Sequence, residues 1–458
     1  MSAEQPRRNA MLALRAIPAA LGAVMVLAAL LGDRLTGGGG GIGRTQVLLL
    51  VVGLLLLLGG ILAQRAVPLY KAVALMALNT VVLLVVLELG AAVLGTLLGE
   101  PETAGAGGMV QVDPDESVPM RGRLPYYASR DWGAQHWVEY ASADKRTVFH
   151  PYVMWRTAPF ASQTINVDSA TGNRRTPGAD CRPGSFKVFT FGGSGMWGVG
   201  SPDWGTIAAH LQTQLAGQME RPVCVVNYGE RGFVVTQGAI QLMRQLQYGN
   251  VPDLALFYDS VNDVETAYVY GRAGLPMGME GIASKLEGRD QPAPRWFEST
   301  SIYQLLSRFA PRQAASTAIQ TAKLAADSAR IDSVASSVVT LYLETYDMVD
   351  ALARQHGFAY GFFWQPHIVI GAKRLTAEER AIAMLAGEQA RRPFNERIFA
   401  RIAAAARQRP HLHYLGGVFD REPSLVYVDS HHLTPEGNEI VARAMVGAMR
   451  PALRAAVK

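Results

Sequence analysis

Three side chains in the second half of the sequence have the types and spacing needed for nucleophilic catalysis. Ser194 stands in a glycine-rich turn, GGSGMWG, directly after an apolar run that predicts a strand. Asp429 and His432 lie three residues apart in DSHHLTPEG, just before the last predicted helix. This spacing lets a carboxylate accept the Nδ1 proton of an imidazole whose Nε2 faces a nucleophile, as in a serine hydrolase triad. His431 lacks that spacing, so we predict His432 as the base.

Two further blocks follow the second and third predicted strands, namely NYGERG at Asn227–Gly232 and DSVND at Asp259–Asp263. The carboxyl ends of parallel strands meet at one edge of a sheet, where ligands bind. A glycine amide and an asparagine side chain directed at one point, together with the amide of Ser194, would form an oxyanion hole. Taken alone, each block is more typical of an ordinary turn, because Gly, Asn and Asp dominate turns for local reasons.

The glycine-rich turn allows two other interpretations. Gly193, Gly195 and Gly198 match GxGxxG after a strand, which would suggest a dinucleotide site with Glu230 as the ribose partner. A plain strand-to-helix turn is the third interpretation. The turn lacks the GK[ST] ending of a phosphate-binding loop. A nucleotide-binding domain would leave the DxxH pair near the C-terminus unexplained.

Together, the four blocks resemble those of the SGNH or GDSL-type hydrolases and occur in the family's order. By this resemblance Ser194 is the nucleophile, and Asp429 with His432 is the closing DxxH pair. The resemblance also implies that Gly232 is the oxyanion glycine and that Asn262 is the oxyanion asparagine. The family's activity, ester hydrolysis or acyl transfer through an acyl-enzyme, is then expected without a metal or cofactor.

The resemblance extends over about Phe189–Val441 and has two departures. Gly193 replaces the aspartate of GDS, and Ser260 replaces the glycine of GxND. Neither change removes a proton-transfer group or a proposed oxyanion donor. These two departures imply a divergent branch of the family, so the substrate of this chain cannot be inferred from well-known lipases.

From Lys187 onward, short apolar runs alternate with helical patterns, which predicts a parallel sheet wrapped by helices. We expect an α/β domain at 118–458 with an irregular N-terminal portion and an insertion at about 266–330. The resemblance implies a three-layer α/β/α sandwich with a five-stranded parallel sheet, the flavodoxin-like SGNH fold. The predicted strands are Lys187–Phe191, Val223–Tyr228, Asp253–Tyr258, Phe358–Trp364 and His411–Phe419, and the predicted helices are Thr206–Leu215, Thr236–Gln247, Val334–His356, Thr376–Arg407 and Pro435–Ala455.

The first hundred residues have the composition of a membrane anchor. The chain has 458 residues, of which 49% are hydrophobic and only 18% charged, and its mean hydropathy is +0.10. Apolar stretches at about 11–32, 45–64 and 72–95 each approach the roughly 20 residues needed to span a bilayer. We therefore expect three transmembrane helices within 1–100, followed by a Gly/Pro/Asp/Glu linker at 101–117.

The distribution of charge predicts the orientation of these helices. Basic residues precede the first stretch and occupy the second short loop, whereas the segment after the third stretch is acidic. Because Lys and Arg stay preferentially in the cytoplasm, the α/β domain is expected in the periplasm or outside the cell. Arg34 and Arg44 in the first loop oppose this orientation. Glu88, the one ionisable residue of the third stretch, is expected near the outer interface.

This location limits the expected substrates and partners. A domain outside the cytoplasm has no supply of acyl coenzyme A or nicotinamide cofactor, so acyl esters of cell-surface polysaccharide or lipid remain. The resemblance implies acetyl esters, since similar bacterial domains often remove or add acetyl groups on polysaccharides. Two alternatives stay open, an O-acyltransferase served by a membrane-bound acyl-transfer partner and a catalytically silent carbohydrate-binding subunit. The net charge of +5 is scattered, so no nucleic-acid partner is expected.

The sequence also supports predictions for two candidate substrate-binding residues and for the two cysteines. Trp197, beside the nucleophile, and His367, after the fourth strand, are candidates for binding substrate. Core packing for Trp197 and a structural role for His367 are the alternatives. Cys181 and Cys224 lie near the amino edge of the predicted sheet and form either a disulfide or two free thiols. Neither belongs to a CxxC pair or has a His at ligand spacing, so no zinc site is expected.

Overall fold

The computed structural model describes residues 16–31, 44–62, 67–97, 124–279, 282, 300–309 and 328–457. The chain divides into two compact units, each considered separately below. One consists of Met1–Pro101 with Ala293–Ala310, and the other of Glu102–Pro292 with Pro311–Lys458. The predicted linker at 101–117 lies outside the described residues, as does much of the predicted insertion.

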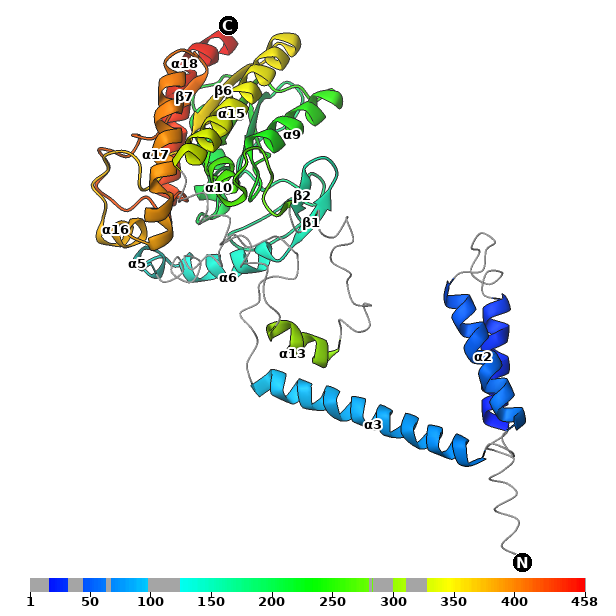
Figure 1. Ribbon diagram of the computed structural model, residues 1–458. Coiled ribbons are helices and arrows are strands. Elements are labelled where there is room, and N and C mark those ends of the chain that lie inside the picture. Colours follow the sequence, from blue (N-terminus) through cyan, green and yellow to red (C-terminus); the bar gives the residue numbers. More distant parts are fainter. Residues whose placement is uncertain are drawn as a thin grey trace, which may run out of the picture. The chain divides into compact units, whose positions relative to one another are not determined.

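The larger unit is built on a parallel five-stranded sheet with the order β4-β3-β5-β6-β7 (Figure 1). This α/β sheet is the predicted one, and all five predicted strands occur in it. The last strand is much shorter than predicted, because the chain turns away after Tyr414. The strands are β3 (Phe186–Gly192), β4 (Val223–Asn227), β5 (Leu254–Asp259), β6 (Ala359–Trp364) and β7 (Leu412–Tyr414).

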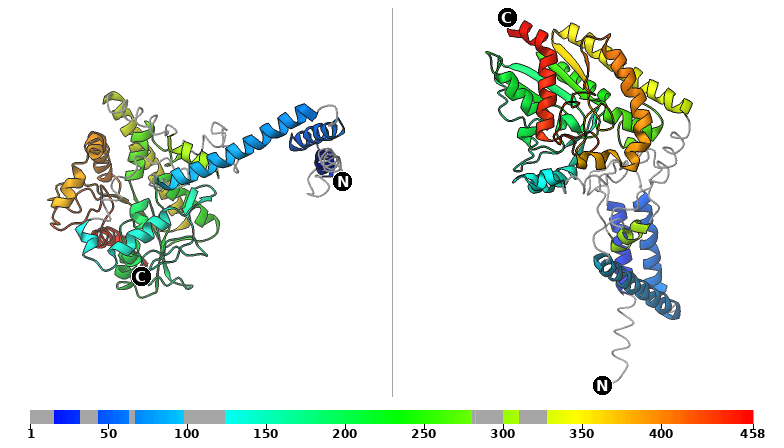
Figure 2. Two further views of the ribbon diagram at one scale, coloured as in Figure 1. Left: turned by 90° about the horizontal axis from the view of Figure 1, so that it is seen from below. Right: turned by 90° about the vertical axis from the view of Figure 1, so that its left-hand side faces the viewer.

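Both faces of the sheet are apolar and buried, as expected for a parallel sheet between two helical layers. On one face Phe257 stacks between Phe191 and Phe362, with ring centroids 4.8 and 4.4 Å apart. On the other face Val188 and Leu256 are buried. The layers can be followed in Figures 1 and 2: the first face packs against α9 (Val235–Gln247), α10 (Val261–Tyr270), α15 (Ser328–His356) and α17 (Ala386–Ala406), and the second against α8 (Ile207–Ala216) and α18 (Pro435–Val457).

Local sequence signals explain where several helices begin. The Thr206 side chain accepts a hydrogen bond from the amide of Ala209 and so caps α8. Thr376 and Glu379 form a capping box at the start of α16 (Ala377–Ala383). The single helix predicted over Thr376–Arg407 is therefore two helices, α16 and α17.

An irregular N-terminal portion precedes the sheet, as predicted. It contains α5 (Pro125–Ala128), α6 (Gly133–Asp144) and an antiparallel pair of strands, β1 (Thr147–His150) and β2 (Met154–Thr157). It contacts the loops at the strand ends, since the hydroxyl of Tyr127 donates to the carbonyl of Gly200 at 2.7 Å. The indole of Trp155 likewise donates to the carbonyl of Arg231 at 2.9 Å.

The smaller unit contains apolar helices. Two are long and apolar enough to cross a membrane by length and composition, over Thr45–Leu62 in α2 (Arg44–Leu62) and Ala72–Leu94 in α3 (Val67–Leu97). At the position of the first predicted span, the structure has a shorter apolar helix over Ala16–Leu31. The residues before this helix lie outside the described part. Three clear spans are therefore not found in the described residues.

The first apolar helix packs closely on α2 through glycine. A Cβ added at Gly22 would lie 2.6 Å from the carbonyl oxygen of Gly53, and one at Gly53 would lie 2.9 Å from that of Gly22. Small residues that let two helices approach this closely are typical of helix pairs in membranes.

Cys181 and Cys224 form a disulfide, which settles the alternative left open by the sequence. Their Cα atoms are 4.7 Å apart, and Cys224 is the second residue of β4. The bond therefore lies at the amino edge of the sheet, opposite the edge that carries the predicted site.

Candidate active site

Ser194, His432 and Asp429 form a continuous chain of hydrogen bonds at the carboxyl edge of the sheet. His432 Nε2 lies 2.7 Å from Ser194 Oγ, and His432 Nδ1 lies 2.6 Å from Asp429 Oδ2. Because the carboxylate accepts the proton on Nδ1, Nε2 has a lone pair free to accept the serine proton. His432 and Asp429 are 5% and 2% exposed, whereas Ser194 is half-buried and so accessible from outside.

The loop before α18 fixes the orientation of Asp429 and His432. Asp429 Oδ1 accepts hydrogen bonds from the amides of His431 and His432 at 2.9 and 2.7 Å. The carboxylate is thereby held by its own loop while Oδ2 faces the imidazole. The amide of Val428 donates to the carbonyl of His432 at 2.9 Å, which closes the loop.

Ser194 is the first residue of α7 (Ser194–Trp197), and Gly193 separates it from the end of β3. Gly192 allows this sharp turn, because its φ is +154° and a Cβ there would lie 2.3 Å from the carbonyl oxygen of Tyr258. At Gly193 a Cβ would lie 2.3 Å from Asn262 Nδ2. The departure from GDS therefore has a physical reason, since the asparagine amide occupies the space that an aspartate side chain would need.

Three hydrogen-bond donors lie on the loops around Ser194. Within the described residues, the backbone amides of Ser194 and Gly232 have no acceptor. Asn262 Nδ2 donates one hydrogen to the carbonyl of Phe233 at 2.8 Å and keeps its second hydrogen for another acceptor. These are the donors that the sequence predicts for an oxyanion hole. Gly232 has a φ of +75°, a conformation that favours glycine.

Two buried carboxyl groups, Asp259 and Asp263, lie close to Asn262 in the sequence. Asp263 accepts a hydrogen bond from the amide of Val235 at 3.2 Å, and so fixes the start of α9. Burial raises the pKa of Asp263 to about 7. Burial, and then the neighbouring Asp263, raise the pKa of Asp259 well above its usual range. Asp259 and Asp263 lie on either side of Asn262 in the sequence, at the start of α10. Protonation of either carboxyl group is therefore linked to the segment that carries Asn262.

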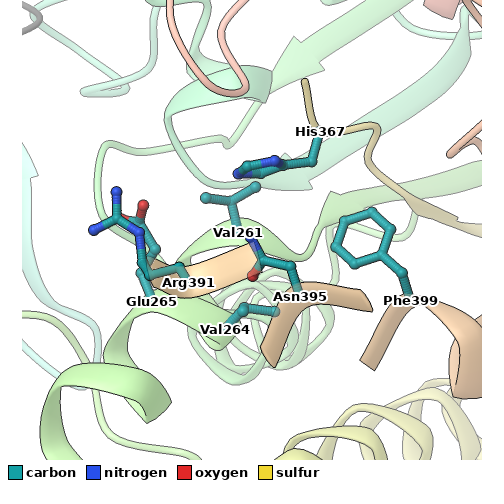
Figure 3. A pocket seen from close by; sticks show the side chains of 7 residues that line it. All are labelled: Val261, Val264, Glu265, His367, Arg391, Asn395 and Phe399. Carbon is teal, nitrogen blue, oxygen red and sulfur yellow. The ribbon is translucent and has the colours of Figure 1, made fainter. Parts of the chain in front are cut away.

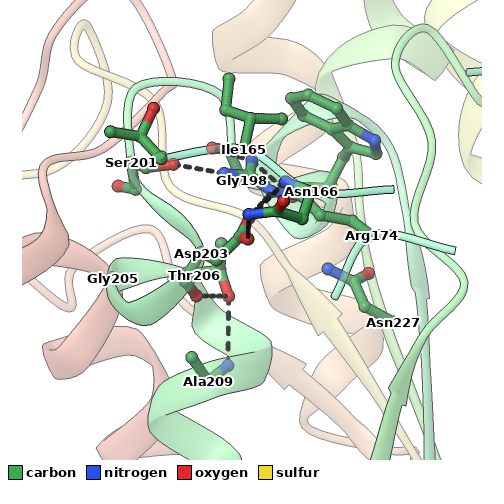
Figure 4. A network of polar contacts seen from close by, with 12 residues as sticks. Ile165, Asn166, Arg174, Gly198, Ser201, Asp203, Gly205, Thr206, Ala209 and Asn227 are labelled. Atoms are coloured by element: carbon green, nitrogen blue, oxygen red, sulfur yellow. Dashed lines mark hydrogen bonds and ion pairs between the residues drawn. The ribbon is translucent and has the colours of Figure 1, made fainter. Parts of the chain in front are cut away.

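A buried arginine holds the segment that follows the nucleophile (Figure 4). Arg174 Nη1 donates to the carbonyls of Trp197 and Gly198 at 3.0 and 2.7 Å, and Nη2 donates to that of Ser201 at 2.6 Å. Its Nε pairs with Asp203 at 3.0 Å. Carbonyls at the end of α7 lack helical partners, so this guanidinium supplies donors that the short helix cannot.

The same arginine connects the nucleophile turn to the histidine loop. The hydroxyl of Ser201, whose carbonyl binds Arg174, donates to the carbonyl of Leu433 at 3.3 Å. Leu433 directly follows His432. Asn438 Nδ2 also donates to Ser201 Oγ at 2.9 Å. Ser201, which Arg174 holds through its carbonyl, is thus also in contact with the segment that carries His432.

This role of Arg174 could not be recognised from the sequence. The only signal was a basic pair, Arg174-Arg175, in an otherwise irregular segment. A pair of arginines gives no indication of which one is buried, and its partners lie more than twenty residues away in the chain.

Trp197 does not lie where the substrate-binding prediction requires. It is 1% exposed, and the guanidinium groups of Arg174 and Arg231 lie 4.4 and 5.2 Å from its ring centroid. A ring covered in this way has no face for a sugar, so the packing alternative describes it better.

His367 is also buried, with 3% exposure, and lines a narrow pocket (Figure 3). Its Nε2 lies 3.7 Å from Glu388, and its ring stacks on that of His431 at 6.4 Å between centroids. Burial lowers the pKa of His367 to about 4, so the ring is neutral at pH 7. The other residues lining the pocket are Val261, Val264, Glu265, Arg391, Asn395 and Phe399.

The residues proposed for a nucleotide are engaged elsewhere. Glu230 is 1% exposed, and its oxygens accept from the amide and hydroxyl of Thr157, each at 2.7 Å. A carboxylate held in this way cannot bind a ribose, which removes the acidic partner of the GxGxxG interpretation. Asp429, His431 and His432 have possible metal ligands within 4.8 Å of one another, but both ring nitrogens of His432 already face Asp429 and Ser194.

Comparison with known proteins gives structural likeness only. No family model and no curated protein matches the chain. A putative G-D-S-L family lipolytic protein from Desulfitobacterium hafniense is 9% identical, with a TM-score of 0.30 over 58% of this chain and 99% of that one. The lipase Lip_vut3 from a goat rumen metagenome is 12% identical, with a TM-score of 0.32 over 58% and 97%.

A third similar structure is a catalytic mutant of an acetylxylan esterase from Geobacillus stearothermophilus. It is 15% identical, with a TM-score of 0.27 over 60% of this chain and 96% of that one. At TM-scores this low, the three likenesses carry no argument about the family, the activity or the substrate of this chain.

Proposed function

We propose that the chain is a membrane-anchored serine esterase acting on acyl esters, in particular acetyl esters, of cell-surface polysaccharide or lipid. The observation that carries the proposal is the chain of hydrogen bonds from Ser194 through His432 to Asp429, with distances of 2.7 and 2.6 Å. A buried carboxylate, an oriented imidazole and an accessible hydroxyl are the parts that acyl transfer requires.

In the first half-reaction Ser194 Oγ attacks the ester carbonyl carbon while its proton passes to His432 Nε2. The developing oxyanion accepts hydrogen bonds from the amides of Ser194 and Gly232 and from Asn262 Nδ2. When the tetrahedral intermediate collapses, the carbon–oxygen bond to the alcohol breaks and the alcohol oxygen takes the proton from Nε2. An acyl-serine remains, and Asp429 stabilises the imidazolium that forms on the way.

The second half-reaction repeats these steps with water. His432 takes a proton from water, the hydroxide oxygen attacks the acyl carbon, and Ser194 leaves with the proton returned by the imidazolium. If a sugar hydroxyl replaces water, the acyl group is transferred instead. The O-acyltransferase alternative therefore uses the same residues and differs in its acceptor and in a membrane partner that delivers the acyl group.

Two observations support a location in the membrane with the catalytic unit outside the cytoplasm. Thr45–Leu62 and Ala72–Leu94 are long and apolar enough to span, and the helix pair joined at Gly22 and Gly53 packs as membrane helices do. The disulfide between Cys181 and Cys224 is the form expected in an oxidising compartment.

The test uses the full-length chain in detergent and a short aryl ester as substrate. We expect saturable hydrolysis that Ser194→Ala and His432→Ala each reduce by about a thousandfold or more in kcat. Ser142→Ala is the control, because Ser142 is exposed on α6 and its hydroxyl bonds only within that helix. Hydrolysis that survives in Ser194→Ala would refute the proposal. Acyl-serine formation without hydrolysis, relieved by added sugar, would identify the acyltransferase.

A further inference from the structure

Helix α13 (Ser301–Phe309) belongs to the unit of apolar helices, although in the chain it lies between α10 and α15 of the catalytic unit. Residues Ala293–Ala310 group with Met1–Pro101. Within that unit α13 packs against α3, near its C-terminal end (Figure 1). The chain therefore leaves the catalytic unit after α10, contacts an apolar helix, and returns at α15.

The contact is made by the one ionisable residue of the apolar stretch in α3. The Glu88 carboxylate accepts hydrogen bonds from the backbone amides of Ser301 and Ile302, the latter at 3.1 Å. The first amides of a helix have no partner within the helix, and a negative charge is favourable there. Glu88 therefore caps α13, and α13 compensates a carboxylate that is costly in an apolar environment.

The position of Glu88 places this contact at a defined depth. Glu88 precedes Leu94, the end of the apolar stretch, by six residues. At about 1.5 Å per residue this is about 9 Å along the helix axis. Interfacial helices insert their apolar side about 5–10 Å into the boundary between headgroups and acyl chains. The start of α13 thus lies at the depth of an interfacial helix.

The apolar residues of α13 follow the spacing of one helix face. Ile302, Leu305 and Leu306 occupy positions i, i+3 and i+4. Ile302 and Leu305 are half-buried, while Leu306 is 61% exposed. The exposed apolar surface continues that of α3, where Leu89, next to Glu88, is 62% exposed. Acyl chains that cover α3 would also cover Leu306.

We propose that α13 is an interfacial membrane helix, docked on α3 by Glu88 and covered on its exposed apolar side by lipid. The proposal rests on the membrane anchoring of the proposed function. It gives the catalytic unit a second connection to the bilayer, through its own insertion, in addition to the chain that follows α3. Glu88 is then a docking residue rather than part of a proton pathway.

The experiment places a single fluorescent label on the full-length protein in lipid nanodiscs. The chain has two cysteines, both in the disulfide, so Leu306→Cys introduces the one reactive thiol. Leu89→Cys on α3 and Met348→Cys on α15, both exposed, are the reference positions. Fluorescence is compared between ordinary phospholipid and phospholipid brominated on its acyl chains, which quenches only labels in contact with the chains.

We expect the label at Leu306→Cys to be quenched comparably with Leu89→Cys and at least about twofold more than Met348→Cys. Adding Glu88→Ala should reduce quenching at Leu306→Cys and leave Leu89→Cys unchanged. Quenching at Leu89→Cys without quenching at Leu306→Cys would overturn the proposal while leaving the anchor intact. No quenching at either position would overturn both. Quenching at Leu306→Cys that Glu88→Ala does not reduce would refute the docking role of Glu88.

Discussion

The side chain of Asn262 donates a hydrogen bond to the carbonyl of Phe233 at 2.8 Å, and this bond joins the start of α10 to the loop that carries Gly232, another proposed oxyanion donor. Phe233 directly follows Gly232, so the asparagine fixes the glycine amide as well as offering its own second hydrogen. Two of the three proposed oxyanion donors, Gly232 and Asn262, are therefore linked by one hydrogen bond. Removing this one side chain should affect catalysis in two ways.

We predict that Asn262→Ala lowers kcat for an aryl ester by about 100-fold or more, with a much smaller change in KM. The loss falls on kcat because the oxyanion forms only in the transition state. Circular dichroism and thermal melting would verify that the variant is folded. A reduction of less than about tenfold in a folded variant would exclude Asn262 from the oxyanion hole.

Placing the aspartate of a GDS motif at position 193 should impair this protein. A Cβ at residue 193 would lie 2.3 Å from Asn262 Nδ2, so Gly193→Asp must displace the asparagine or the turn. We expect kcat to fall at least about 100-fold, since displacements near 1 Å at a catalytic site can have that effect. Gly217→Ala, where the nearest atoms are 3.8 Å away, is the matched control. Full activity in Gly193→Asp would contradict the explanation given for the departure from GDS.

Removing the charge of Arg174 should lower stability, whereas changing its shape and keeping its charge should lower kcat. Arg174→Ala leaves the buried Asp203 without its charged partner, so we expect a loss of about 3–5 kcal/mol in the free energy of unfolding. Arg174→Lys keeps the charge but cannot reach three carbonyls and Asp203 together. We expect it to fold with kcat reduced about 10- to 100-fold and KM nearly unchanged. Chemical denaturation and steady-state kinetics measure the two effects, and wild-type kcat in Arg174→Lys would show that the guanidinium does not position the nucleophile.

The raised pKa of Asp263 gives stability a specific dependence on pH. Its folded-state pKa of about 7 lies above the ordinary value of 3.8, so the folded state binds the proton more tightly. The contribution is fully present below pH 3.8 and is lost as the pH rises through about 7. Asp263→Asn keeps an acceptor for Val235 and removes the titration. The melting temperature of wild type relative to Asp263→Asn should therefore fall between pH 4 and pH 8.

Comparing the two proteins removes the contributions of shared groups that do not interact with Asp263. The part of the raised pKa of Asp259 that is due to Asp263 is lost in Asp263→Asn, and it acts in the same direction as Asp263 itself. His136 and His367 act in the opposite direction, because burial lowers their pKa values to about 3 and about 4. Their contribution is lost as the pH falls below about 6.5, and it is the same in both proteins. A difference in melting temperature that stays constant, or rises, from pH 4 to pH 8 would contradict the raised pKa of Asp263.

The parts of the site that sequence could predict are those encoded by local pattern. Strand ends were recognisable from apolar runs followed by glycine, and the DxxH spacing brought Asp429 and His432 together within one loop. The sequence could not indicate that Asn262 fills the space at Gly193, or that Arg174 connects two segments. Both depend on distances between residues far apart in the chain, for which a single sequence offers no pattern.

The membrane unit illustrates the same limit. Hydropathy located the apolar stretches, but it also predicted a full first span where the described helix covers only Ala16–Leu31. The charge of Glu88 suggested a position near the interface. Its partners, the amides of Ser301 and Ile302, lie more than two hundred residues further along the chain. Contacts to backbone amides cannot be recognised in a sequence, because every residue except proline has an amide hydrogen.

The central claim, that Ser194 is the nucleophile of a Ser-His-Asp triad, is tested most directly by covalent labelling. The full-length protein is treated with a fluorophosphonate, digested, and the modified residue identified by mass spectrometry. We predict a single modification on Ser194, absent in Ser194→Ala and at least about a hundredfold slower in His432→Ala. Failure of the folded wild-type protein to react, or modification of a different serine, would contradict the assignment of Ser194 as nucleophile.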